Sequence, residues 1–179
     1  QTDVDNLYYK KVKTIYGEII KYSPAAQNTL SLNKKQSKAI VDIKIANRKM
    51  VEIIKDAKEL NRNINLSLAS NNKYMIAEYD NFRKKAVKVL RVIYLFRKSE
   101  DSKKYAEKLK QLKKEAKANI RQSNKSIDKL IRKELITVEM ASSLFNDYSN
   151  VNDMIKKLIE IAELLYGHID SLLDENNGI

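Results

Sequence analysis

The chain of 179 residues has no cysteine, no tryptophan, one histidine, one proline and three glycines. Without cysteine there is no disulfide scaffold, no thiol catalysis and no zinc ribbon or iron–sulfur site. The lone histidine, His168, rules out a multi-histidine metal site. So few glycines and prolines argue against a turn-rich β-sandwich or barrel and against glycine-loop nucleotide folds. No nucleophile–base pair can be assembled from the sequence, so we predict that the protein is not an enzyme.

Apolar residues make up 43% of the chain and charged residues 32%. This balance is too apolar for a disordered chain and is typical of amphipathic helices that pack into a bundle. The longest purely apolar run is Val92–Phe96, far shorter than the roughly 18 residues of a membrane span.

Helical spacing of apolar residues predicts five long helices, over about 3–29, 33–68, 73–98, 103–134 and 137–174. Boundary residues support these ranges, because asparagine, aspartate, serine and threonine favour helix ends and proline disrupts helices. We therefore predict an all-α, up-and-down bundle that forms a single domain over residues 1–179. The predicted boundary residues are Pro24, which should bend or end the first helix, Asn33 with Gln36, Asn71 with Asn72, Asp101 or Ser102, and Thr137.

The formal net charge of +12 is unevenly distributed. Residues 97–133 contain fourteen Lys/Arg against five acidic residues, whereas the last predicted helix is acidic. A positive surface attracts anionic partners such as lipid head groups or nucleic acid. The basic stretch contains one aromatic residue, Tyr105, and has no nucleic-acid recognition signature, so we predict no specific nucleic-acid partner. A solvated helix face or contact with an anionic lipid surface remain the alternatives.

Two acidic residues, Glu52 and Asp56, are four positions apart and therefore share one face of the second predicted helix. Two neighbouring carboxylates need a cation, which could be a divalent or ferric metal ion or the ammonium groups of Lys49 and Lys55. Asp147 falls at the edge of the apolar face of the last helix, where a carboxylate needs a partner. We expect that partner to be an Arg, a Lys or a neighbouring backbone group, and the alternative is a supporting role for Asp147 in metal binding.

Three segments, 52–63, 78–83 and 136–147, resemble the PhoU-like cytoplasmic C-terminal domain of bacterial sodium/phosphate cotransporters. The resemblance implies two three-helix repeats, about 1–70 and 71–175, with the first helix missing. It also implies metal binding by Glu-x-x-x-Asp patterns, which match Glu52 with Asp56. In the second repeat Ser149 replaces the glutamate and leaves Asp153, which puts a shared metal cluster in doubt.

The function implied by this resemblance is regulatory and non-enzymatic. The domain would lie on the cytoplasmic side of the inner membrane and contact the membrane transport domain of the same polypeptide. The alternative is a fragment of a surface-exposed helical lipoprotein that binds a host partner. A missing first helix would leave an apolar groove that a second copy of the chain could cover as a homodimer.

Overall fold

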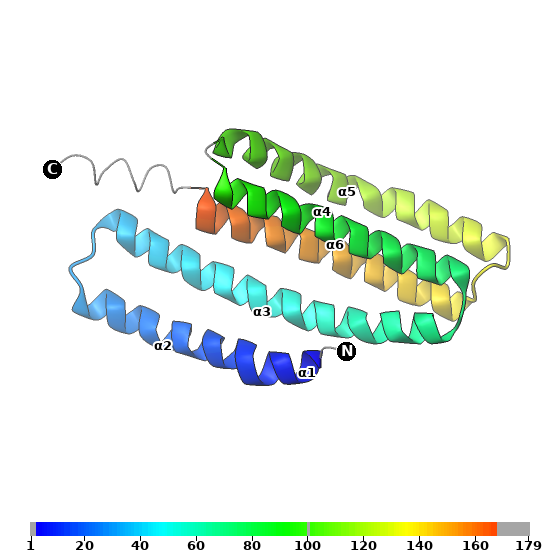
Figure 1. Ribbon diagram of the computed structural model, residues 1–179, viewed down its shortest axis with the longest axis horizontal. Coiled ribbons are helices and arrows are strands. Elements are labelled where there is room, and N and C mark those ends of the chain that lie inside the picture. Colours follow the sequence, from blue (N-terminus) through cyan, green and yellow to red (C-terminus); the bar gives the residue numbers. More distant parts are fainter. Residues whose placement is uncertain (1–2, 100, 168–179) are drawn as a thin grey trace.

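The computed structural model describes residues 3–99 and 101–167, and in these ranges the chain is helical with no strands. The N-terminal helix consists of α1 (Val4–Asn6), a π-helical segment η1 (Leu7–Val12) and α2 (Lys13–Thr29). Four further helices follow, α3 (Lys34–Ala69), α4 (Lys73–Lys98), α5 (Ser102–Arg132) and α6 (Val138–Tyr166). The predicted all-α bundle of five long helices is therefore confirmed (Figure 1).

The predicted caps explain where these helices begin. Asn33 and Gln36 form a reciprocal capping box at the start of α3. Asn71 has a positive φ of 52°, which asparagine tolerates, and the side chain of Asn72 caps α4. Asp101 and Thr137 accept hydrogen bonds from the first-turn N–H groups of Lys104 and Met140, at 3.2 Å each.

Pro24 does not end its helix, because α2 continues to Thr29. The predicted end of this helix near residue 29 is therefore confirmed, and of the two effects expected of Pro24, bending or ending the helix, the ending does not occur. The neighbouring Ser23 hydroxyl donates to the Ile19 carbonyl at 2.6 Å, so one backbone acceptor near the proline is still used. The predicted end of the last helix near residue 174, together with His168, lies outside the described residues.

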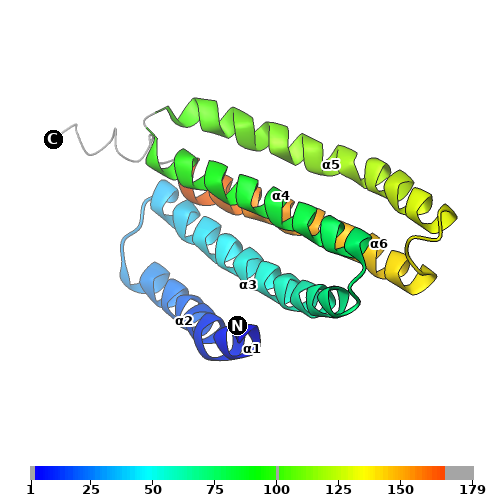
Figure 2. The same cartoon turned by 45° about the vertical axis from the view of Figure 1, so that its right-hand side comes forward.

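The main core lies between α4, α5 and α6, and α6 also packs against α3. In Figure 1, α6 is visible between α3 and α4, while α2 lies against α3 on the side of the molecule away from α5. Figure 2 shows the same order of helices from a second direction. No helix in the described ranges has the length and hydropathy needed to cross a membrane. The most deeply buried large apolar side chains are Val89, Leu109, Ile127, Leu144 and Ile159.

Candidate functional site

Glu52 and Asp56 share a lysine from α6. The Lys157 ammonium lies 3.0 Å from the Asp56 carboxylate and 3.5 Å from that of Glu52. Partial burial would lower the pKa of Lys157, but its hydrogen bond to Asp56 and the two negative charges outweigh burial and raise that pKa. The cation shared by this pair is thus an ammonium group of α6 rather than Lys49 or Lys55, and Glu52 also pairs with the Arg48 guanidinium at 3.2 Å.

The predicted metal-ligating residues do not meet in one place. Asp153 is exposed and pairs with Lys156 at 2.9 Å, and Asp147 is buried in a separate hydrogen-bond cluster. Across residues 3–99 and 101–167, no group of three or more His, Cys, Asp or Glu side chains could hold a metal ion. Metal binding at Glu52 and Asp56 stays a prediction. Equilibrium dialysis against iron and zinc tests it. A protein that retains no metal in stoichiometric amount would contradict it.

Asp147 is the most unusual acidic residue of the bundle, with 1% of its surface exposed. It accepts a hydrogen bond from the Tyr79 hydroxyl at 2.6 Å and from the Asn63 amide at 2.9 Å. Burial raises the pKa of its carboxyl, and these two hydrogen bonds oppose that rise. The expectation of an Arg, Lys or backbone partner is wrong, because two neutral side chains from α3 and α4 hold this carboxylate.

A second buried contact lies beside the first. The Tyr148 hydroxyl donates to Glu78, and burial together with this hydrogen bond raises the pKa of Tyr148. The ring of Phe82 packs edge-on against both tyrosines, with centroids 5.5 Å from Tyr79 and 4.5 Å from Tyr148. These contacts join α3, α4 and α6 and fix the side chains on which the neighbouring groove is built.

An apolar groove of about 400 Å³ lies over this cluster, between α3, α4 and α6. Its buried part includes Phe82, Val151 and Ile155, and one edge carries the ion pair of Asp80 with Arg83. Groove volumes of this size are typical of binding sites in proteins. The groove is therefore the strongest candidate for a functional site among the described residues.

The apolar residues of both groove walls recur at intervals of seven residues. On α3, Met50, Ala57 and Ile64 follow this spacing, and Ile64 lines the groove. On α4, Tyr79, Ala86 and Ile93 follow it, and Ile76 and Leu90 are two such intervals apart, with the charged Arg83 between them. A seven-residue repeat keeps side chains on the seam between two packed helices.

Several large apolar side chains of α3 and α4 are exposed, because no other helix covers them in the described ranges. Leu68 and Met50 on α3 and Val87, Leu90 and Tyr94 on α4 are all exposed. Leu90, for example, keeps 51% of its surface accessible. Leu68 lines the groove, and exposed large apolar side chains on the helices of an apolar groove favour an interaction site over a solvated face.

The helices that form the groove walls are basic. α3 carries nine Lys/Arg and four acidic residues, and α4 carries eight Lys/Arg and two acidic residues. Arg91, one position after Leu90, is exposed and forms no ion pair with any residue in the described ranges. The groove therefore combines an apolar interior with a positive surround, which favours an apolar ligand with acidic flanks.

Comparison of the chain with protein-family models, with curated proteins and with solved structures finds no match. Sequence reasoning singled out Tyr79, Phe82 and Ala86 as core residues of one helix, and the structure also places them in the groove. The signal that could have revealed the groove is the matching seven-residue spacing of apolar positions on 33–68 and 73–98.

Proposed function

We propose that this protein is a non-catalytic docking module that binds an amphipathic helix of a partner protein in the α3–α4–α6 groove. The observation that carries the proposal is the exposed apolar seam, with seven-residue spacing on two neighbouring helices. Helix-in-groove recognition uses anchors at this spacing. From Ile76 to Tyr94 the seam covers about 27 Å of α4, enough for five turns of a partner helix.

The charges favour an acidic partner over a second copy of the chain. A homodimer through this groove would bring together two molecules that each carry a net charge of +12. Like charges placed opposite one another oppose association, whereas an acidic helix would be attracted to the basic walls. We therefore infer a partner helix with leucine-like residues on one face and glutamate or aspartate on its flanks.

A synthetic peptide tests this proposal. The probe is a three-heptad helix with leucine at the two apolar positions and glutamate at the flanking ones, labelled for fluorescence anisotropy. We expect it to bind at least about tenfold more tightly than the same peptide with lysine flanks, because the groove walls are basic. Leu90→Gln should weaken its binding by about tenfold, because Leu90 is one of the apolar anchors.

The control is Val138→Gln, which removes another exposed apolar side chain, at a position away from the groove. This variant should bind the acidic peptide as the wild type does. Equal binding of the acidic and basic peptides, or equal losses in the two variants, would contradict the proposal. Light scattering of the free protein at high concentration tests the homodimer, for which a purely monomeric mass would be the contrary result.

A regulatory domain of a sodium-dependent phosphate transporter, on the cytoplasmic side of the inner membrane, is the narrower function predicted from the sequence. It stays a prediction, supported by the all-α bundle of five long helices. The coding sequence upstream of Gln1 tests it. Several hydrophobic spans there would favour the transporter, whereas a short signal ending in a lipidated cysteine would favour the surface lipoprotein.

A further inference from the structure

A row of six cations runs along the outer side of α5. Its members follow one another in alternating steps of seven and four residues, and because these eleven residues make about three helical turns, the members share one face. The row spans about 44 Å at 1.5 Å per residue, nearly the whole helix. The six residues, called here the α5 ridge, are Lys103, Lys110, Lys114, Arg121, Lys125 and Arg132.

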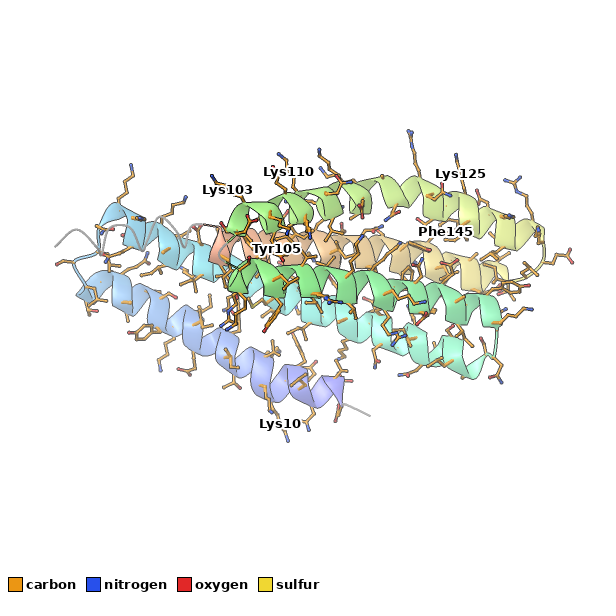
Figure 3. All side chains as sticks on the ribbon, turned by 45° about the horizontal axis from the view of Figure 1, so that its top comes forward. Lys10, Lys103, Tyr105, Lys110, Lys125 and Phe145 are labelled. Atoms are coloured by element: carbon orange, nitrogen blue, oxygen red, sulfur yellow. The ribbon has the colours of Figure 1, made fainter. Side chains whose placement is uncertain are left out.

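The ridge charges are not used to hold the bundle together. All six side chains are exposed, and none forms an ion pair with a residue in the described ranges. In contrast, Lys113 on the inner side of the same helix pairs with Glu160 and Glu163 of α6. Figure 3 shows Lys103, Lys110 and Lys125 extending away from the other helices.

The opposite side of α5 is apolar and faces the core. Leu109, Leu112, Ala116 and Ile127 are buried there against the neighbouring helices. Among the side chains of α5 that the structure describes, the ridge side has no exposed large apolar residue, and Tyr105, the aromatic residue of this helix, packs against the core cluster. A ligand of the ridge would therefore be held by charge, without insertion of apolar side chains and without base stacking.

We propose that the α5 ridge binds the surface of an anionic lipid bilayer. Rows of four to eight Lys/Arg on a helix are attracted to anionic head groups. A row of cations on one outer helix can face a plane of head groups with several of its members at once, whereas a curved duplex backbone crosses such a row only at intervals. Single-stranded nucleic acid is held by aromatic stacking platforms, which this face lacks. Glu107 and Asp128 lie near the row, and the surrounding face remains positive in spite of them.

Vesicle co-sedimentation tests the proposal independently of the groove, which lies on other residues. The probes are vesicles of phosphatidylcholine alone and vesicles with about a third phosphatidylserine, at about 50 mM and 300 mM salt. We expect binding to the anionic vesicles only, with a loss of at least about tenfold at the higher salt. We expect a quadruple variant to partition into the anionic vesicles at least about tenfold less than the wild type at low salt. Its four substitutions are Lys103→Gln, Lys110→Gln, Lys114→Gln and Arg121→Gln.

A matched variant removes the same charge elsewhere. The control positions are exposed lysines of the N-terminal helix and of α3, namely Lys10, Lys11, Lys21 and Lys38. Their replacement by glutamine should lower the partition of the protein into anionic vesicles by less than about threefold. Equal losses in the two variants would overturn the proposal, because they would show an effect of net charge alone. So would the absence of binding to anionic vesicles at low salt, or tighter binding to a short DNA duplex than to these vesicles.

Discussion

Replacement of Asp147 by alanine should lower the free energy of unfolding by about 3 kcal/mol. The carboxylate is the shared acceptor for Tyr79 and Asn63, and all three side chains lie in the packed region between α3, α4 and α6. Alanine would leave a buried hydroxyl and a buried amide without their acceptor and would open a small cavity. Urea unfolding followed by circular dichroism measures this loss.

The control for this substitution is Asp147→Asn, which keeps the shape and removes the charge. The new amide can accept from Tyr79 and, after rotation of the Asn63 amide, donate to its oxygen. We therefore expect Asp147→Asn to stay within about 1 kcal/mol of the wild type. A loss in the asparagine variant as large as that in the alanine variant would show that the negative charge itself, rather than the acceptor, stabilises the bundle.

The wild type and the Asp147→Asn variant should differ in how their free energy of unfolding depends on pH. Burial raises the pKa of the Asp147 carboxyl in the folded state, so the folded protein holds this proton more tightly than the unfolded chain does. The stabilising contribution of the protonated form is present below the unfolded pKa and is lost as the pH rises through the folded pKa. Relative to Asp147→Asn, the wild type should lose stability as the pH rises from about 4, the ordinary pKa of an aspartate, toward neutral. An unchanged difference across this range would contradict the inferred direction of the shift.

The helix boundaries could be predicted because they are encoded locally. Asn33 with Gln36, Asn72 and Thr137 each satisfy first-turn N–H groups with their own side chains, so a few neighbouring residues determine where a helix begins. The continuation of α2 through Pro24 to Thr29 followed from the apolar spacing rather than from a boundary residue. The π-helical turns of Leu7–Val12 leave no distinct mark in the apolar spacing, because a wider turn shifts the register by only one residue.

The contacts of the candidate site could be predicted only in part, because they join residues far apart in the sequence. The burial of Asp147 followed from its place on the apolar face, but its partners come from two other helices. Likewise, the proximity of Glu52 and Asp56 followed from their spacing, but Lys157 lies 101 residues beyond Asp56. The groove exists because α3 and α4 both pack against α6, an arrangement that single-helix patterns do not specify.

Phe82→Ala should be the most damaging single substitution near the groove, at about 4 kcal/mol in the free energy of unfolding. The ring is 2% exposed and makes edge contacts with Tyr79 and Tyr148, which hold Asp147 and Glu78 respectively. Its loss would combine a cavity with the release of two buried hydrogen-bonded tyrosines. Phe82→Leu, which refills most of the volume, should cost about 1.5 kcal/mol in the same urea measurement.

Phe82→Ala and Leu90→Gln together distinguish residues that stabilise the groove from residues that only contact the peptide. Because Phe82 also lines the groove, Phe82→Ala should weaken the acidic peptide even at low temperature, where the variant remains folded. Leu90→Gln, at a half-exposed position, should weaken the peptide with less than about 0.5 kcal/mol of lost stability. If a folded Phe82→Ala protein bound the peptide as well as the wild type, the peptide would lie outside the α3–α4–α6 groove. If both variants lost binding and only Phe82→Ala lost stability, the buried ring of Phe82 would support the groove and the exposed Leu90 would contact the peptide directly.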